Sequence, residues 1–334
     1  MRTSSAIGRE RRTGSAPTLR RPSRGPEPLR VLLTGGHGFV GRRLQRELVA
    51  GGHEVSAPRH DTLDVTRPES VDDALAAGPD AVVHLAAIAF APDADTDTAH
   101  ALNVNVGGTL VLMEALRRLP RTPIVLVVGS ADVYAIAKGA GFSLAEESPL
   151  GIRGSYGLTK VAQEAVAMEA AEREGWSLVV ARAFNHTGPG QRREFVVPAL
   201  ATRVRAVRDG RADVVPVGNL DVRRDLLHVD DVVVAYRLVL EALADGRVPR
   251  GGVVLNVASG RTVSIREVVD GLQLRAGTAA PLFVDPRLVR PNDPPEIRGD
   301  ADRLRALTGW RPTRDLDEIL DDVWADVTGA VRVP

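Results

Sequence analysis

A phenol and an ammonium group, those of Tyr156 and Lys160, stand four residues apart in the sequence. Apolar residues such as Ala162 and Val166 continue at helical spacing, so we expect both polar side chains on one face of a helix. A nearby cation lowers the pKa of a tyrosine below its usual value of about 10, which makes the phenol a usable proton donor or acceptor near neutrality. The pair predicts acid–base chemistry at Tyr156 that depends on Lys160.

Such a pair also occurs by chance on surface helices, but the choice of basic residues in this chain makes it more specific. Among 43 lysines and arginines, only Lys138 and Lys160 are lysines. A compact ammonium on a flexible stem can take a role that a planar guanidinium cannot fill. We therefore interpret Lys160 as a lysine that the chemistry requires.

A serine follows the apolar residues 124–128, within the segment 129–134 (GSADVY). The apolar run predicts a buried strand, and its carboxyl end places the Ser130 hydroxyl at the sheet edge where ligands bind. There the hydroxyl could hold a carbonyl oxygen, although a serine at this point can also serve only the turn. Taken with Tyr156 and Lys160, Ser130 is predicted to be the third catalytic residue.

The second chemical motif is a glycine-rich turn at residues 34–41 (TGGHGFVG), with Gly35, Gly38 and Gly41 at intervals of three. The apolar residues 31–33 before it predict a strand, and the helical period after it predicts a helix. Free N–H groups and the dipole at a helix N-terminus bind pyrophosphate, and glycine lets the ligand approach the backbone. A glycine run alone is weak evidence, but the strand before it and the helix after it predict a nucleotide site.

Strands and helices alternate from this turn onward, which predicts an α/β fold: a doubly wound parallel sheet of the Rossmann type with a smaller C-terminal α/β lobe. We divide the chain into a disordered basic tail (residues 1–28), a dinucleotide-binding domain (29–188) and a mainly substrate-binding lobe (189–334), some of whose segments return to the first domain. Strands are expected at residues 31–33, 53–57, 81–85 and 124–128, and helices near 69–77, 99–119 and 155–174.

The glycine spacing resembles the Thr-Gly-x-x-Gly-x-x-Gly fingerprint of the extended short-chain dehydrogenase/reductases, the nucleotide-sugar epimerase and dehydratase family. Ser130, Tyr156 and Lys160 resemble the catalytic triad of that family, and the resemblance extends over nearly the whole chain from about residue 30. It implies a nicotinamide cofactor, NADP or NAD, and a nucleotide-sugar substrate. The cofactor-binding residues that it implies are Gly35, Gly38, Phe39, Val40, Gly41, Arg59, Asp64, Val65, Leu85, Ala86, Ala87, Asn105, Tyr156 and Lys160.

The choice between NAD and NADP depends on the end of the second strand, residues 56–59 (SAPR). NAD enzymes of this fold commonly carry an acidic residue there, which binds the ribose hydroxyls, and this segment has none. Arg59 could pair with a 2′-phosphate or be simply solvated. NADP is slightly favoured.

The segment 184–191 (FNHTGPGQ) resembles the corresponding part of the GDP-4-keto-6-deoxy-mannose reductases of this family. The segments 224–231 (RDLLHVDD), 290–293 (RPND) and 309–312 (GWRP) also resemble family motifs. The likeness implies that Asn185 and Arg224 contact the substrate diphosphate, in keeping with the bidentate fit of a guanidinium to phosphate. The substrate-binding residues that it implies are Ser130, Asn185, Val196, Arg224, Arg290 and Asp293.

The reaction class follows from what stands next to Ser130. Sugar 4,6-dehydratases of the family have an acid–base pair there, whereas this chain has Ala131 and Asp132. Alanine cannot transfer a proton, so elimination is poorly supported, and Asp132 is either a lone base or a loop carboxylate. The preferred hypothesis is reduction of a sugar C4 ketone, with a redox-neutral 4-epimerase as the alternative. A non-catalytic NAD(P)-sensing protein is the least favoured.

The composition is that of a globular protein, with 44% hydrophobic and 26% charged residues and no cysteine. The absence of cysteine excludes disulfides and thiolate metal sites, fits a cytoplasmic protein, and leaves no metal site predicted. No apolar run is long enough to span a membrane. Residues 1–30 contain eight arginines and two acidic residues, yet the net charge of zero predicts neither a nucleic-acid nor a membrane partner. Family resemblance implies a homodimer through helices near residues 99–119 and 155–174.

Overall fold

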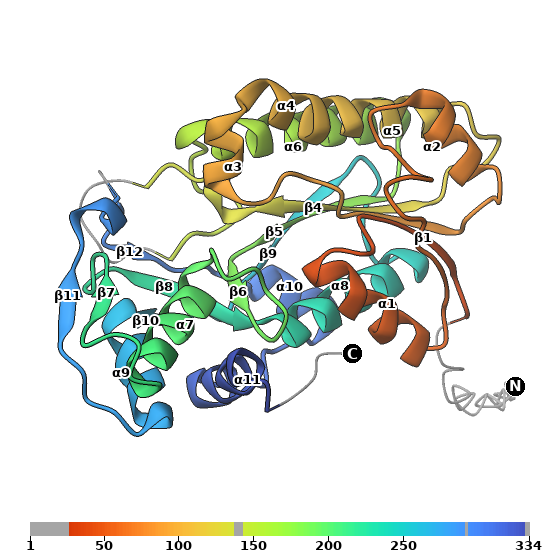
Figure 1. Ribbon diagram of the computed structural model, residues 1–334. Helices are drawn as coiled ribbons and strands as arrows, with labels where there is room; N and C mark the ends of the chain where they lie inside the picture. The colour runs from red at the N-terminus through yellow and green to blue at the C-terminus, as the bar shows by residue number, and fades with distance from the viewer. Residues whose placement is uncertain (1–26, 137–142, 291–292, 331–334) are drawn as a thin grey trace, which may run out of the picture.

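A six-stranded parallel sheet, with strand order β2-β1-β3-β4-β5-β9, forms the centre of the larger half of the molecule (Figure 1). The computed structural model describes residues 27–136, 143–290 and 293–330. Apolar runs such as residues 178–183 are buried on both faces, as parallel strands covered by helices must be. The strands are β1 (Arg30–Thr34), β2 (Glu54–Ser56), β3 (Ala81–His84), β4 (Ile124–Ser130), β5 (Leu178–Ala183) and β9 (Val253–Val257).

Helices cover both faces of this sheet, which confirms the predicted doubly wound fold class. Neighbouring residues of β1 point to opposite faces, so Leu33 packs with Leu44 of α1 while Leu32 packs with Leu112 of α5. The helices on the first face are α1 (Phe39–Ala50), α8 (Val229–Ala244) and α10 (Asp302–Thr308). The others are α2 (Pro68–Leu75), α3 (Ala91–Thr96), α4 (Thr98–Leu102), α5 (Gly108–Arg117) and α6 (Gly154–Glu174).

The single helix predicted over residues 99–119 is interrupted. A π-helical turn, Asn103–Gly107, separates α4 from α5. At Gly108 an added Cβ would lie 2.7 Å from a methyl group of Val65, so the helix packs closely on the loop that follows residue 63. The short helix α3 is absent from the prediction, because its six residues are too few to show a helical apolar period.

The smaller lobe has its own sheets and core. Leu200, Val268 and Leu320, one from each of its helices, pack together there. The lobe strands are β6 (Asn185–Thr187), β7 (Val215–Val217), β8 (Arg223–His228), β10 (Thr262–Ser264), β11 (Leu282–Val284) and β12 (Glu296–Ile297). Its helices are α7 (Val196–Arg208), α9 (Ile265–Ala276) and α11 (Leu316–Thr328). Between these segments the chain returns to the large sheet to add α8, β9 and α10.

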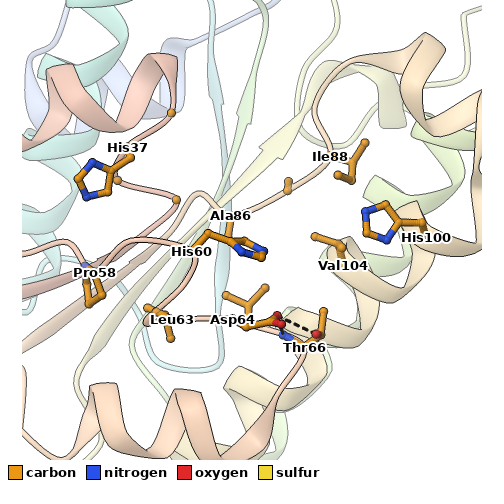
Figure 2. Close-up of a pocket in the computed structure, with 15 residues that line it drawn as sticks. His37, Pro58, His60, Leu63, Asp64, Thr66, Ala86, Ile88, His100 and Val104 are labelled. Atoms are coloured by element: carbon orange, nitrogen blue, oxygen red, sulfur yellow. Dashed lines mark hydrogen bonds between the residues drawn. The ribbon is translucent and has the colours of Figure 1, made fainter.

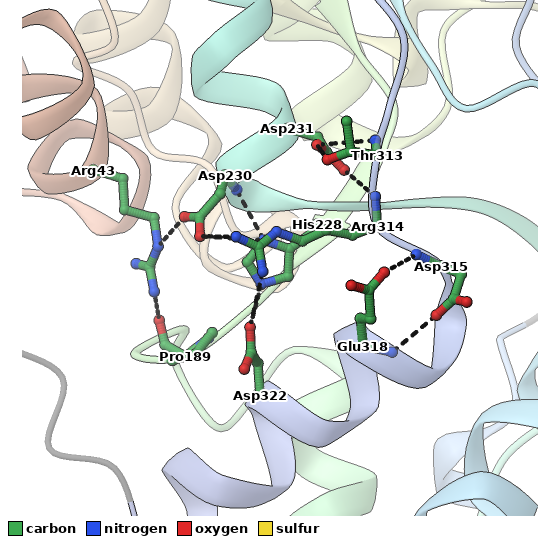
Figure 3. Close-up of polar contacts among 10 residues, drawn as sticks. All are labelled: Arg43, Pro189, His228, Asp230, Asp231, Thr313, Arg314, Asp315, Glu318 and Asp322. Carbon is green, nitrogen blue, oxygen red and sulfur yellow. Dashed lines mark hydrogen bonds and ion pairs between the residues drawn. The ribbon is translucent and has the colours of Figure 1, made fainter. Parts of the chain in front are cut away.

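A polar junction ties α1 to the lobe (Figure 3). The buried guanidinium of Arg43 in α1 donates to the Asp230 carboxylate at 3.1 Å and to the carbonyl oxygen of Pro189. Asp230 also pairs with Arg314, which pairs in turn with Asp322 of α11. The junction therefore fixes the glycine-turn helix against both ends of the lobe sequence.

The predicted tail, residues 1–28, falls almost entirely outside the described residues. Within the described ranges, no helix has the length and apolar character needed to cross a membrane.

Candidate active site

The glycine-rich turn joins β1 to α1 with almost no room for side chains. Gly35 has a φ of +68°, and a Cβ at this residue would lie 2.7 Å from the Ala86 nitrogen. A Cβ at Gly41 would lie 2.4 Å from the Gly35 carbonyl oxygen. Gly38, the N-cap of α1, caps the helix with no side chain, so the first N–H groups stay available for an anion. The turn has the structure that a bound pyrophosphate needs.

A cavity of about 280 Å³ opens between the carboxyl ends of β1 and β3 (Figure 2). The chain leaves β1 towards β2 on one side and returns to β3 on the other, so this crevice is the switch point at which such sheets bind ligands. The cavity volume suits part of a dinucleotide. Its lining residues are Gly35, Gly36, His37, Gly38, Pro58, His60, Leu63, Asp64, Val65, Thr66, Ala86, Ala87, Ile88, His100 and Val104.

The predicted cofactor residues divide into those that line this cavity and those that lie beside or behind it. Arg59 is exposed and does not line the cavity, although its neighbours Pro58 and His60 do. The lining residues among those predicted are Gly35, Gly38, Asp64, Val65, Ala86 and Ala87, and those outside the lining are Phe39, Val40, Gly41, Arg59, Leu85, Asn105, Tyr156 and Lys160.

Three imidazoles, those of His37, His60 and His100, line the cavity and were not predicted. Their sequence positions, in three separate segments, carry no shared pattern. The His37 ring bonds to the Ala57 carbonyl oxygen at 3.0 Å, which links the glycine turn to the end of β2. Asp64 is held differently, because its carboxylate accepts from the Thr66 nitrogen at 2.9 Å and from the Thr66 hydroxyl at 2.7 Å, so its pKa is lowered.

Asn105 lies behind the cavity wall and is fully buried in the π-helical turn. Its amide oxygen accepts from the Ile88 nitrogen at 2.7 Å, and its amide nitrogen donates to the Ile88 carbonyl oxygen and to the Thr159 hydroxyl. These bonds tie the loop after β3 to α6. This geometry gives Asn105 a structural role.

The three predicted catalytic residues meet one strand further along the sheet edge, outside the cavity. Ser130 is the last residue of β4, and Tyr156 and Lys160 lie in the first turns of α6. The Ser130 hydroxyl lies close enough to the Tyr156 hydroxyl to lower the pKa of the phenol. The Lys160 ammonium lies 6.0 Å from the centre of the Tyr156 ring and donates to the Val128 carbonyl oxygen at 3.0 Å. The end of β4 and the start of α6 thus bring a hydroxyl, a phenol and an ammonium together.

The expectation that Lys160 lowers the pKa of Tyr156 is wrong for this structure. Burial of the hydroxyl and the nearby Asp132 carboxylate raise the pKa of Tyr156, and the hydrogen bond to Ser130 only partly opposes them. The phenol is therefore protonated at neutral pH. Burial lowers the pKa of Lys160 to about 8, so its ammonium is still mostly charged at neutral pH.

Asp132 forms an ion pair with an arginine that the sequence analysis did not identify. Its carboxylate pairs with the Arg153 guanidinium at 2.7 Å, and Arg153 is the residue directly before α6, three residues before Tyr156. The ion pair holds this carboxylate against the residue that precedes α6. Of the two roles left open for Asp132, the geometry favours the loop carboxylate over the lone base.

The residues predicted for the substrate lie on the lobe and its edge. Arg224 in β8 pairs with Asp293 at 2.5 Å. Burial lowers the pKa of Arg224, the Asp293 carboxylate opposes that change, and the positive charges of Arg153 and Arg290 lie close enough to lower it further. This places three guanidinium groups in one neighbourhood. Asn185 is exposed at the start of β6, next to β8, and Val196 is 44% exposed at the start of α7. The rest of the 290–293 segment, residues 291–292, lies outside the described residues.

Comparisons with known proteins bear on this arrangement. Residues 31–258 match the model of the NAD dependent epimerase/dehydratase family. The GDP-6-deoxy-D-mannose reductase of Pseudomonas aeruginosa is 36% identical over 306 residues, covering 91% of this chain and 98% of the relative. The UDP-glucose 4-epimerase of Azospirillum brasilense is 28% identical over 320 residues, covering 87% and 90%. The structure of RMD from Pseudomonas aeruginosa complexed with NADPH has a TM-score of 0.81 and 34% identity, covering 91% of this chain and 100% of that chain.

Proposed function

The chain belongs to the NAD dependent epimerase/dehydratase family, and from this premise we propose that it is an NAD(P)H-dependent nucleotide-sugar reductase. The substrate that we propose is GDP-4-keto-6-deoxy-D-mannose, and the product is GDP-D-rhamnose. The observation that carries the proposal is the 36% identity, over nearly the full length of both chains, to a GDP-6-deoxy-D-mannose reductase. A protonated Tyr156 beside Ser130 agrees with it, because reduction of a ketone needs a proton donor.

The cofactor that we propose is NADP(H) or NAD(H), with NADP(H) slightly favoured. The glycine turn supports this choice, because at Gly35 and Gly41 a Cβ would collide with backbone and the helix N-terminus behind them is free. The cavity between β1 and β3 supports it too, and the segment that directly follows β2, residues 57–60, contains no acidic residue. A bound nicotinamide in its reduced form supplies hydride to the substrate carbon.

We assign the chain's own groups as follows. The Ser130 hydroxyl holds the C4 carbonyl oxygen and polarises it, and the Tyr156 phenol donates its proton to that oxygen as the negative charge develops. The Lys160 ammonium holds the cofactor ribose. Arg224 and Asn185 hold the substrate diphosphate, Arg290 and Asp293 the nucleotide, and Val196 packs on the substrate.

A redox-neutral 4-epimerase is the second candidate, and the similarity to a UDP-glucose 4-epimerase favours it. An epimerase needs the same three catalytic groups, so the triad does not discriminate. A 4,6-dehydratase is less well supported, because Ala131 has no titratable group and Asp132 is paired with Arg153. A non-catalytic role has no observation in its favour.

The experiment mixes purified protein with NADPH or NADH and GDP-4-keto-6-deoxy-D-mannose, and follows the absorbance of the reduced nicotinamide and the product by NMR. The proposal expects one cofactor oxidised for each sugar reduced, with ring couplings that report the rhamno configuration. No oxidation, together with interconversion of an intact GDP-, UDP- or dTDP-hexose, would establish the epimerase instead. Repeating the assay with both cofactors over a range of concentrations tests the NADP preference.

We propose a homodimer formed through α5 and α6, a cytoplasmic location, and the division of the chain at residues 28 and 188. On α5, Leu110 is 50% exposed and lies on the proposed interface. Nucleic acid and membrane are not proposed as partners.

A further inference from the structure

A chain of polar side chains runs through the interior behind the catalytic lysine, between α5, α6 and β3. Buried polar groups persist only where their hydrogen bonds are satisfied, so the bonds of this chain define its orientation. Each member is at most 3% exposed, and the mechanism above uses only the first of them. The members are Lys160, Gln163, Thr109, His84 and Thr34.

Thr109 sets the direction of the hydrogen bonds. Its hydroxyl donates to the Asn105 carbonyl oxygen at 2.7 Å, which uses its only proton. The oxygen therefore accepts from its other two neighbours, the Gln163 amide nitrogen and the His84 Nε2, each at 3.0 Å. One threonine thus fixes both the amide orientation of Gln163 and the tautomer of His84.

The orientation of the Gln163 amide determines which of its atoms faces the catalytic lysine. With its amide nitrogen on Thr109, its oxygen Oε1 faces Lys160 and accepts from the ammonium at 2.7 Å. The flipped amide would place N–H groups against the ammonium, donor against donor. Because the Val128 carbonyl oxygen takes a second ammonium proton at 3.0 Å, the third is the one left for the ligand.

His84 extends the chain to the cofactor cavity. Since Nε2 carries the proton, Nδ1 accepts from the Thr34 hydroxyl at 2.8 Å, and the Thr34 oxygen accepts from the nitrogen of Ala86 at 3.2 Å. Ala86 lines the cavity. Burial lowers the pKa of His84 to about 3, so the ring stays neutral and the direction of the bonds stays fixed at working pH.

We propose that Gln163 is a positioning residue for Lys160, held in its single working orientation by Thr109 and His84, and that this buried chain aims the third ammonium proton at the cofactor ribose. The identity of the ligand rests on the proposed function, whereas the orientation of the lysine does not. Gln163 touches no reacting atom in this proposal. It acts by presenting an oxygen to the charged ammonium and by leaving that group one free proton.

The chain offers a direct readout, because Lys138 and Lys160 are its only lysines. In a Lys138→Arg background, protein labelled with ¹³C-lysine gives one ¹³Cε signal, whose titration reports Lys160 without cofactor or substrate. Gln163→Met removes an acceptor from the charged ammonium, and the pKa of Lys160 should fall by about one pH unit. Gln163→Glu places a carboxylate there, and the pKa should rise by at least as much.

A matched control is Gln273→Met, which replaces another buried helical glutamine, in α9, and should leave the titration unchanged. If either Gln163 variant does not fold, Thr109→Val tests the same chain by removing the acceptor that orients the amide, and Thr109→Ser should restore the wild-type titration. Titrations that match the wild type, or that move the same way for Met and Glu, would overturn the proposal. If the Lys160 pKa shifts as expected in both Gln163 variants but the reductase assay fails, this inference stands and only the proposed substrate is ruled out.

Discussion

At the scale of single residues, the protonation of Tyr156 is the feature that most directly affects catalysis. Its raised pKa makes it an acid at neutral pH, and Tyr156→Phe removes the proton while keeping the ring. We expect kcat to fall by about 10²–10⁴-fold, the usual contribution of a general acid, with NADPH affinity changed by less than about threefold. Steady-state kinetics and fluorescence titration with NADPH measure the two quantities separately. Unchanged turnover would remove Tyr156 from the mechanism.

A buried histidine predicts how stability depends on pH. His84 has a pKa of about 3 in the folded chain, against about 6.5 when unfolded, so between these values the unfolded chain binds a proton that the folded chain does not. Acidification therefore favours unfolding, and stability that is present at pH 7 is lost as the pH falls below 6.5. Between pH 7 and pH 5 the cost is about 2 kcal/mol.

The substitution His84→Gln removes this pH-dependent contribution to stability, because an amide takes up no proton. Urea unfolding of both proteins at pH 7 and pH 5 should show the wild type losing about 2 kcal/mol more than the variant. Parallel losses in the two proteins would show that His84 is protonated in the folded state or does not titrate between these pH values.

At the scale of elements, the glycines of the nucleotide turn have separable roles. A Cβ at Gly41 would lie within 2.6 Å of backbone atoms of Gly35 and Gly36, so Gly41→Ala must open the turn and should cost about 3 kcal/mol of stability. Gly38→Ala meets only the Gly35 carbonyl oxygen at 3.2 Å and should fold with a loss below about 1 kcal/mol. Its methyl group would instead stand where a phosphate approaches, and NADPH affinity should fall. Thermal unfolding and NADPH titration distinguish the two variants, and equal effects on both properties would contradict this division.

The sequence predicted the elements well where an apolar period is continuous. The strands of residues 31–33 and 124–128 and the helix of residues 155–174 are found with ends displaced by no more than two residues. The π-helical turn Asn103–Gly107 was missed, because its cause is the contact of Asn105 with Ile88 and Thr159, far away in the chain. Only tertiary packing defines such a break in a helix.

The same distinction between local and distant contacts holds for the residues of the site. Local motifs predicted the glycine turn, Ser130, Tyr156 and Lys160, which are set by the end of one strand or the start of one helix. Gln163 was missed because its partner Thr109 is 54 residues away, on another helix. Arg153 was missed for a similar reason, as its partner Asp132 lies across a loop 21 residues earlier. Residues whose chemistry depends on a distant partner leave no pattern in the sequence.

At the scale of the whole molecule, the junction of Figure 3 couples the nucleotide turn to the lobe. Arg43 in α1 is buried. The substitution Arg43→Met removes the donor that Arg43 supplies to the Pro189 carbonyl oxygen and to Oδ1 of Asp230. We expect a loss of about 1–3 kcal/mol in the free energy of unfolding. Arg46→Met, an exposed arginine on the same helix, is the matched control and should change stability by less than about 0.5 kcal/mol. Equal losses in urea unfolding would show that the junction does not stabilise the fold.

The proposed dimer is the last property of the whole molecule, and two exposed leucines test it. Leu110 on α5 is 50% exposed and lies on the proposed interface, whereas Leu274 on α9 is 79% exposed and belongs to the lobe. A charge placed in an apolar interface loses its hydration without a partner, so Leu110→Glu should raise the dissociation constant at least about 100-fold. Leu274→Glu, the same change at a more exposed site, should leave it unchanged. Sedimentation velocity over a concentration series measures both, and a wild-type monomer, or a dimer broken only by Leu274→Glu, would rule out this interface.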